Sequence, residues 1–421
     1  MRVALVGAGS LDFTGPLLRS LMPVVRRHSL HISLCDHDPQ AMEDMPAIAR
    51  ALADESGTTL EPDGGTSVAE VVGDAQFVVL TLNHGGLTAD KADIHNALDH
   101  GLFPKHVDTI GPAGWLRALR MGAFMHGLLP QTANDAVVLD LSNPLALIVR
   151  MAVRRGLAAF GFCHGAMNRA KSFQDWLGLS EPAQMQVWGT NHLAWLASFR
   201  LGGRDLYPDL IGFLQHSPDH AHWRYNVELY ERHGMMPVLE AQHCGDFFEG
   251  LNDEQALRDY GLHLWEGEPR QANAAQRSQR RADLAAGRRP LSDIGPSCEG
   301  VAEVIDALLG GSPHRGILNA PLPEAANGMP AGAIVETWMT VNEGGADIEP
   351  PPTLPQALQD HLARIALQQN LAAEAFETGD MSKLLEAMCL EPNIRGEDVA
   401  RSMLTRALSE HAGLLGSSWR L

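Results

Sequence analysis

In the first half of the chain, short apolar runs alternate with longer stretches of helical character. The apolar runs have the length of strands that are buried on both faces of a sheet. Short buried strands that alternate with helices are typical of a parallel, doubly wound sheet. The sequence therefore predicts an α/β fold, with strands at 2–6, 31–34, 75–82, 136–141, 156–162 and 185–188 and helices at 16–27 and 42–55.

The pattern changes at about residue 196, where long and mostly helical segments begin. Residues 267–290 are polar and rich in charge, which predicts a surface helix or a loop. Three more helices are expected, at 354–378, 380–388 and 396–412. Because 421 residues are too many for one ordinary core, we expect two domains, 1–195 and 196–421, the second a mostly helical α+β unit.

The first apolar run leads directly into a glycine loop, Gly7-Ala8-Gly9-Ser10, and then into a helix. This order is the fingerprint of a dinucleotide site, although Asp12 takes the place of the third glycine. Asp36 ends the second strand, where a carboxylate accepts the ribose hydroxyls of NAD and repels the 2′-phosphate of NADP. We therefore expect a Rossmann-like domain that binds NAD, with Asn83 also at the cofactor; a plain tight turn is the alternative.

The charge and the cysteines of the chain exclude several kinds of partner. A net charge of −19 argues against nucleic acid and against an anionic membrane surface, because both require a positive field. No apolar run is as long as a membrane span, and the N-terminus begins a strand rather than a signal peptide. The cysteines, five in number and widely scattered, are no disulfide framework, which predicts a reducing, cytoplasmic location.

A cysteine and a histidine follow two of the later strands. Cys163 follows the run at 156–162, and His192 follows the run at 185–188. Because ligands gather outside the carboxyl ends of the strands, we expect both side chains at one rim, at the ends of neighbouring strands. A thiolate and an imidazole together suit a soft-to-borderline divalent metal. The alternatives are a buried core cysteine and a structural histidine; His243 would complete the metal site or contact the substrate.

Two further segments carry polar groups that suit a ligand. Asn143 stands before Pro144 and after a buried strand, so its amide reaches the same rim, unless the pair simply makes a turn. The segment from Asp108 to Arg117 is rich in glycine, with a carboxylate at its start and a cation at its end. It either cradles a polar ligand or is an ordinary loop. A dinucleotide site and a metal site in one chain indicate the oxidation of a substrate hydroxyl.

Together these motifs resemble glycoside hydrolase family 4, the NAD- and manganese-dependent glycosidases, over nearly the whole chain. The resemblance includes the glycine loop, Leu34-Cys-Asp36, Asp108-Thr-Ile-Gly-Pro-Ala-Gly114, Ser142-Asn-Pro144, Cys163-His164, Gly189-Thr-Asn-His192, Phe247-Phe248, Asn319-Ala-Pro, Ile334-Val-Glu336-Thr and Leu354-Pro355. The Cys-His dipeptide is similar to that of members acting on unphosphorylated α-glycosides. The Gly-Pro-Ala-Gly and Val-Glu-Thr surroundings are most similar to the α-galacturonidase branch.

The resemblance implies a reaction by oxidation and elimination. NAD⁺ takes hydride from C3 of the sugar, the acidified C2 proton is removed, the aglycone leaves C1, water adds and the hydride returns. A divalent cation such as Mn²⁺, held by Cys163 and His192, stabilises negative charge on the sugar oxygens. The family is an exception to the scheme with two catalytic carboxylates. We expect Asn143, His164 and Asn191 to bind the sugar, and Asp108 to give acid–base assistance to the leaving group.

One departure from the family concerns the base that removes the C2 proton. Relatives of the galacturonidase type carry Gly-Asp-Arg-His where this chain has Glu240-Ala241-Gln242-His243. The aspartate of that motif falls on Ala241, which takes no proton, so Glu240 or His243 would have to replace it. The arginine falls on Gln242, which weakens the case for a sugar that bears a carboxylate. The expected substrate is an unphosphorylated α-galacturonide, glucuronide, glucoside or galactoside.

Two rival interpretations are left open by the sequence. A lactate- or malate-type NAD-dependent dehydrogenase shares the sheet and the fingerprint, but it needs no metal thiolate and accumulates NADH. A catalytically silent NAD-bound sugar sensor is conceivable because of Ala241. The resemblance further implies a homodimer or homotetramer, with 1–195 binding NAD and 196–421 binding the substrate and forming the oligomer.

Overall fold

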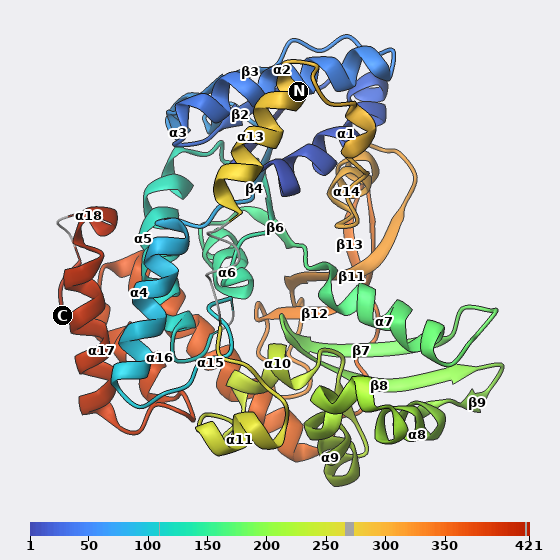
Figure 1. The fold of residues 1–421 in the computed structure, drawn as a ribbon, viewed down its shortest axis with the longest axis vertical. Helices are drawn as coiled ribbons and strands as arrows, with labels where there is room; N and C mark the ends of the chain where they lie inside the picture. Colours follow the sequence, from blue (N-terminus) through green and yellow to red (C-terminus); the bar gives the residue numbers. More distant parts are fainter. Residues whose placement is uncertain (109, 266–272, 417–418) are drawn as a thin grey trace.

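The computed structural model describes residues 1–108, 110–265, 273–416 and 419–421. Within these ranges, one mixed sheet of 13 strands forms the centre of the molecule (Figure 1). Its strands are β1 Arg2–Val6, β2 His31–Cys35, β3 Asp63–Gly65, β4 Phe77–Leu80, β5 Val137–Asp140, β6 Ala158–Gly161, β7 Gln184–Thr190, β8 Leu193–Leu201, β9 Arg204–Asp205, β10 Met236–Pro237, β11 His314–Pro321, β12 Ile334–Asn342 and β13 Gly345–Ile348.

The parallel half of the sheet confirms the predicted Rossmann-like arrangement. Its strand order is β3-β2-β1-β4-β5-β6, and every neighbouring pair in it is parallel. This order is that of a doubly wound dinucleotide-binding sheet. The predicted strand at 75–82 is shorter in the structure, because the chain leaves the sheet after Leu80 and continues as a loop at the carboxyl edge of the sheet.

Helices cover both faces of the sheet. They are α1 Leu11–His28, α2 Pro39–Glu55, α3 Val68–Val72, α4 Gly86–Asp99, α5 Gly114–Leu128, α6 Leu145–Arg154, α7 His164–Trp176, α8 Tyr207–His216, α9 Arg224–His233, α10 Ala241–Cys244, α11 Glu254–Asp259, α13 Ala274–Ala285, α14 Val301–Leu308, α15 Gln356–Thr378, α16 Met381–Cys389, α17 Glu397–Glu410 and α18 Ala412–Leu415. Short 3-10 turns lie at Leu129–Gln131, Pro218–Trp223, Gly245–Phe247 and Leu291–Asp293.

The first two helices begin earlier than predicted, for local reasons. Helix α1 starts at Leu11 and contains Pro16 in its interior. Helix α2 starts at Pro39 because the Asp38 carboxylate accepts a hydrogen bond from the backbone N–H of Gln40 and caps the helix. Both helices therefore begin directly at the carboxyl edge of the sheet.

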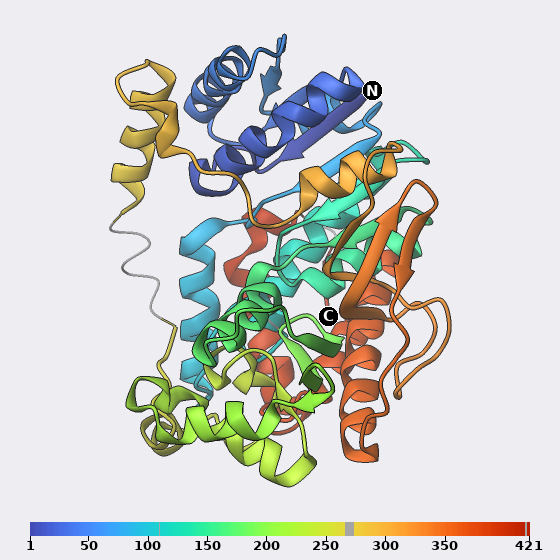
Figure 2. The ribbon, with the colours of Figure 1, turned by 90° about the vertical axis from the view of Figure 1, so that its right-hand side faces the viewer.

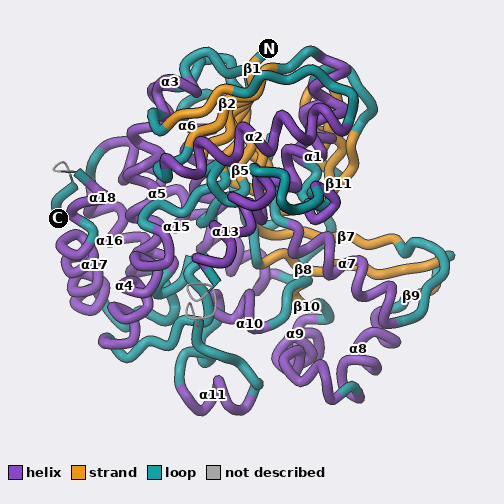
Figure 3. Tube along the Cα trace, turned by 45° about the horizontal axis from the view of Figure 1, so that its top comes forward, coloured by secondary structure: helices purple, strands orange, loops and turns teal. Residues whose placement is uncertain are grey.

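The alternation of side chains along β1 shows how the core divides into two faces. Val3 and Leu5 pack with α1, α2 and α14 on one face, whereas Ala4 and Val6 pack with α5 and α6 on the other. Figure 3 shows the orange strands between these helical layers. The C-terminal helices confirm the prediction closely, and α15 packs on α5 and α6 while α17 packs on α4.

The second half of the chain adds strands to the same sheet. Strands β11 and β12 lie between β6 and β7, and β7 is antiparallel to both of its neighbours, β12 and β8. The prediction that Cys163 and His192 end neighbouring strands is therefore wrong. The order along the chain did not indicate that strands from residues 314–342 would separate β6 from β7.

Residues 267–272 of the polar segment at 267–290 lie outside the described residues, and the described remainder contains helix α13. The helix packs along α2, far from it in sequence, as the yellow segment beside the blue one in Figure 2 shows. The domain boundary at 195/196 stays a prediction. None of the helices in the described ranges combines the length and the apolar character that a membrane crossing requires.

Candidate active site

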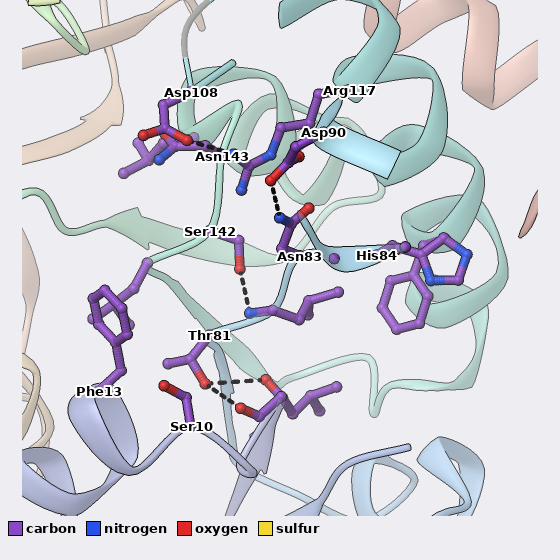
Figure 4. A pocket seen from close by; sticks show the side chains of 18 of the residues that line it. Ser10, Phe13, Thr81, Asn83, His84, Asp90, Asp108, Arg117, Ser142 and Asn143 are labelled. Atoms are coloured by element: carbon purple, nitrogen blue, oxygen red, sulfur yellow. Dashed lines mark hydrogen bonds and ion pairs between the residues drawn. The ribbon is translucent and has the colours of Figure 1, made fainter. Parts of the chain in front are cut away.

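A cavity of about 970 Å³ opens at the carboxyl edge of the parallel strands (Figure 4). It is bordered by the loops after β1, β2, β4, β5 and β6, together with the turn after β7 and helix α10. The predicted site residues that line it are Gly7, Ser10, Asp36, Asn83, Asp108, Asn143, Cys163, His164, His192 and His243. Gly9, Glu240 and Asn191 are not among its lining residues.

The glycine loop between β1 and α1 is shaped so that only glycine fits at its two positions. Gly7 has φ of 88°, and a Cβ there would lie 2.7 Å from the Thr81 carbonyl carbon. A Cβ on Gly9 would lie 2.7 Å from Cγ of Asp36. The backbone N–H of Gly9 instead donates to the Asp36 carboxylate at 2.8 Å. The loop therefore has the close backbone approach that a dinucleotide fingerprint requires.

The loop after β4 carries Asn83 and is fixed by buried charges. Asn83 donates to Asp90 at 2.7 Å, as the dashed line in Figure 4 shows. The guanidinium of Arg120, with a fully buried side chain, bonds Asp90 at 2.9 Å and Asp93 at 2.7 Å and also bonds the His84 carbonyl. Asn83 is thus held at the cavity wall by residues of α4 and α5.

Cys163 and His192 meet in the wall of the cavity, although their strands are not neighbours. Cys163 Sγ lies 3.5 Å from His192 Nε2. Two ligands of one metal ion, at about 2.3 Å for sulfur and 2.1 Å for nitrogen, are separated by roughly 3.1 to 3.6 Å for bond angles between square and tetrahedral. The side chains therefore fit a shared divalent ion.

Burial and neighbouring charges set the protonation of this pair. Burial, and then the charge of Glu336, raises the pKa of the Cys163 thiol far above its usual value. Burial, and then His243, lowers the pKa of His192 to about 3, so its imidazole is neutral. A metal ion supplies the positive charge that converts such a thiol to a thiolate. The donor set and its burial both suit a metal.

Glu336 of β12 fixes the turn between β7 and β8 that carries His192. Its Oε1 accepts from the amides of Asn191 and Asn319, each at 3.1 Å. Burial raises the pKa of Glu336 to about 7. His192 itself has φ of 66°, an uncommon backbone conformation that the surrounding structure must hold in place. Asn191 thus acts behind the cavity wall, and a direct contact with the sugar stays a prediction.

His243, Glu240 and Arg169 are linked by hydrogen bonds at the side of the cavity. His243 Nδ1 lies 2.6 Å from Glu240 Oε1, and Arg169 bonds the other oxygen at 2.8 Å. Burial would raise the pKa of Glu240, but the hydrogen bond and charge of His243, and then the charge of Arg169, outweigh it and lower the pKa to about 2. Glu240 is 4% exposed, whereas the His243 ring lines the cavity.

A buried ion pair joins the two segments that carry the remaining catalytic candidates. Lys105 Nζ lies 2.7 Å from Asp246 Oδ1, with side chains 0% and 1% exposed. The Asp246 carboxylate also accepts from the backbone N–H groups of Lys105 and His106, each at 3.2 Å. The pair ties the loop of Asp108 to the segment that follows His243. Arg117 bonds the Asp108 carboxylate at the cavity wall (Figure 4).

Asn143 and His164 lie on the wall near Cys163. Asn143 Oδ1 is buried and has no hydrogen-bond partner among the described residues, so it can accept from a ligand. The Asn143–Pro144 peptide is cis. His164 Nδ1 lies 2.5 Å from Glu299 Oε1, and this bond raises the pKa of His164. Both side chains thus offer polar atoms beside the proposed metal ligands, Cys163 and His192.

Several residues of the site were not found from the sequence. Arg169, Lys105 and Asp246 carry no local signal, because each acts through a partner distant in the chain. Glu336 does carry one: it is a single carboxylate within the apolar run of β12, and such a buried acid requires partners.

Comparison with known proteins adds the family. The model of the family 4 glycosyl hydrolases matches residues 2–179, and the model of their C-terminal domain matches residues 187–394. The chain belongs to glycosyl hydrolase family 4. The resemblance drawn from the motifs is therefore confirmed, and the two family models divide the chain between residues 179 and 187.

Relatives within the family have different names. An alpha-galacturonidase of Thermoanaerobacterium saccharolyticum is 27% identical, over 87% of this chain and 85% of its own length. An alpha-galactosidase of Rhizobium meliloti is 23% identical, over 93% and 84%. The solved structure of a 6-phospho-alpha-glucosidase from gut microorganisms, in complex with NAD and Mn²⁺, has a TM-score of 0.79 at 22% identity and covers 98% of both chains. That likeness confirms the fold.

Proposed function

We propose that the protein is an α-glycosidase that uses NAD⁺ and a divalent cation, Mn²⁺ by preference, on an unphosphorylated α-glycoside. The observation that carries the proposal is the contact of Cys163 with His192 in the cavity that begins at the dinucleotide loop. Membership of family 4 and the names of the relatives support it. When bound, NAD⁺ supplies reversible hydride acceptance at C3 of the sugar, and the cation supplies a Lewis acid.

The residues of the proposed site divide into three groups. Cys163 and His192 hold the cation. The cofactor residues are Gly7, Gly9, Ser10, Asp36 and Asn83. Asn143 and His164 bind sugar hydroxyls beside the cation, since the unpartnered Asn143 oxygen is an acceptor and His164 lines the same wall.

For the C2 proton we propose His243 as the base and Glu240 as the residue that positions it. His243 lines the cavity, whereas both oxygens of Glu240 are already bonded, one to His243 and one to Arg169. Because Nδ1 of His243 faces Glu240, Nε2 is the atom left to take the proton. Asp108, held by Arg117, assists the departure of the aglycone.

The charges along the cavity support a substrate without a phosphate. Among the described residues that line it, Arg117 is the one lysine or arginine, and it already pairs with Asp108. Gln242, at the position of the family arginine, bonds His263 and does not line the cavity. We therefore favour a neutral galactoside or glucoside over a uronide.

The location and assembly belong to the same proposal. The five cysteines are all free, which supports a reducing cytoplasm. We propose a homodimer or homotetramer there, to be measured by light scattering of the purified protein.

A panel of nitrophenyl α-glycosides tests the activity. Glucoside, galactoside, glucuronide and galacturonide are each incubated with and without Mn²⁺ and NAD⁺, in the presence of a thiol. We expect nitrophenol release that requires both additions, deuterium at C2 of the product in heavy water, and no net NADH. Accumulating NADH would indicate a dehydrogenase instead, and the absence of any hydrolysis would favour a sugar sensor.

Two variants test the assignment of the base. In His243→Gln, C2 deuterium exchange should vanish, because the amide that replaces the imidazole cannot take the proton and Asp108 is already paired with Arg117. In Glu240→Gln, exchange should slow but persist, because the base is still present and only its support is weakened. Unchanged exchange in Glu240→Gln would remove Glu240 from the mechanism, and unchanged exchange in His243→Gln would reject His243 as the base.

A further inference from the structure

Helix α13 of the second half reaches the dinucleotide loop of the first half through one buried arginine. Arg281 is 7% exposed, and its guanidinium makes three polar contacts. Its Nη1 donates to the Gly9 carbonyl at 3.0 Å, its Nη2 bonds Asp38 at 2.9 Å, and its Nε bonds Asp44 at 3.0 Å. The described part of the segment 267–290 includes a mostly exposed helix, as one of the two predicted alternatives has it, but the sequence did not indicate that Arg281 would be buried against the dinucleotide loop.

These contacts complete a closed ring of hydrogen bonds around the loop. The backbone N–H of Asp38 donates to one oxygen of Asp36 at 3.0 Å. The other oxygen of Asp36 accepts from the backbone N–H of Gly9 at 2.8 Å. Arg281 bonds both the Gly9 carbonyl and the Asp38 carboxylate, and so joins the two ends of the chain of bonds. The ring fixes Gly9 and Asp36 relative to one another.

We infer that Arg281 is a positioning residue for the dinucleotide, which sets the cofactor affinity of the first half from the second half of the chain. The inference rests on the proposed use of NAD⁺. Asp36 can present its remaining lone pairs to the ribose hydroxyls only while both of its oxygens are held by the backbone, and Arg281 secures that arrangement on two sides. Its rigid, planar guanidinium reaches three acceptors from three separate nitrogen atoms, a geometry that the single nitrogen of an ammonium group does not reproduce.

Helix α13 also contacts the residue that replaces the third glycine of the fingerprint. In the motif, the third glycine allows close packing of the helix against the strand. Here the loop is held instead by a side chain from outside the nucleotide-binding unit. Arg280 of the same helix lies near Asp12, at 3.4 Å, so the residue that replaces the third glycine is engaged by α13 as well.

Calorimetric titration of NAD⁺ into the full-length protein tests the inference. We expect Arg281→Met to raise the dissociation constant for NAD⁺ by about tenfold or more, because charge-assisted hydrogen bonds to the loop are lost. Arg281→Lys should recover part of the loss. The affinity for Mn²⁺ and the kcat at saturating NAD⁺ should stay at wild-type values, which a general structural defect would not allow. Arg288→Met is the matched control, because Arg288 lies just after the end of α13 and pairs with Asp283 of that helix.

Asp38→Asn serves as a second variant if Arg281→Met does not fold. The asparagine keeps an oxygen to cap α2 but loses the ion pair with Arg281. Because the Arg281 guanidinium still bonds the Gly9 carbonyl, we expect a smaller rise in the dissociation constant for NAD⁺ than in Arg281→Met. Wild-type affinity in folded Arg281→Met, or a rise of equal size in Arg288→Met, would overturn the inference. A wild-type protein that binds no NAD⁺ at all would overturn the proposed function itself, which separates the two failures.

Discussion

Replacement of Lys105 by methionine should destabilise the protein strongly, because it leaves a charge buried without its partner. The two charges of the pair lie 2.7 Å apart, with side chains 0% and 1% exposed. At an effective dielectric constant of about 20, such a pair attracts by roughly 6 kcal/mol, which offsets a desolvation cost of several kcal/mol for each ion. Removal of one partner loses the attraction but leaves the cost of the other, about 3–5 kcal/mol.

The free energy of unfolding, measured by urea denaturation with tryptophan fluorescence, gives the magnitude. The double variant Lys105→Met/Asp246→Asn keeps an acceptor for the backbone N–H groups and has no buried charge, so it should be about 2 kcal/mol more stable than Lys105→Met alone. Lys171→Met is the control, since Lys171 pairs with Asp175 at 2.7 Å with side chains 76% and 61% exposed. That variant should lose less than about 1 kcal/mol. A loss below about 1 kcal/mol in Lys105→Met, or a double variant no more stable than the single one, would refute the reasoning.

Three further predictions concern the cavity and the residues that shape it. Cys163→Ser should weaken Mn²⁺ binding by about a hundredfold or more, because a neutral hydroxyl replaces the thiolate, whereas NAD⁺ binding should be unchanged. Calorimetry measures both affinities. A metal affinity equal to that of the wild type would exclude Cys163 as a ligand. The pKa of Glu336 is raised from 4.5 to about 7, so between these pH values the folded state binds a proton that the unfolded state has lost. The free energy of unfolding of the wild type should therefore fall as the pH rises through this window. Glu336→Gln does not titrate, so its stability should rise by about 3 kcal/mol relative to the wild type between pH 5 and pH 8. Parallel stability curves for the two proteins would contradict this. Gly9→Ala should abolish NAD⁺ binding, because its Cβ would lie 2.7 Å from Cγ of Asp36, whereas Gly212→Ala, which has open space around it, should bind normally.

The parts of the fold that depend on local pattern could be predicted from the sequence. Strands β1, β2, β4, β5 and β6 and helices α15 to α17 each carry their own signal in consecutive residues, whereas the three-residue strand β3, Asp-Gly-Gly, carries none. The insertion of β11 and β12 beside β6 carries none, because it is a pairing between segments far apart in the chain. For that reason the sequence placed Cys163 and His192 together by an argument about neighbouring strands that the topology contradicts, even though the side chains do meet.

The choice between Glu240 and His243 shows the same limit at the scale of single residues. Both titrate, and they stand three positions apart on one short segment. Which of them faces the cavity depends on Arg169 of α7, which draws the carboxylate inward and away from the cavity. No sequence pattern indicates the contact between Arg169 and Glu240, whereas the distances from Glu240 to Arg169 and to His243 show which residue faces the cavity.

The position of β11 and β12 between β6 and β7 has a consequence for synthesis on the ribosome. Cys163 and His192 are only 29 residues apart, yet the strands that hold them become parts of one sheet only after residues 314–342 have emerged. The contacts of β11 and β12 with β6 and β7 join segments far apart in the sequence, and such contacts form late. We therefore expect nascent chains that end before β12 to take up no metal ion, so that metal loading follows translation rather than accompanying it.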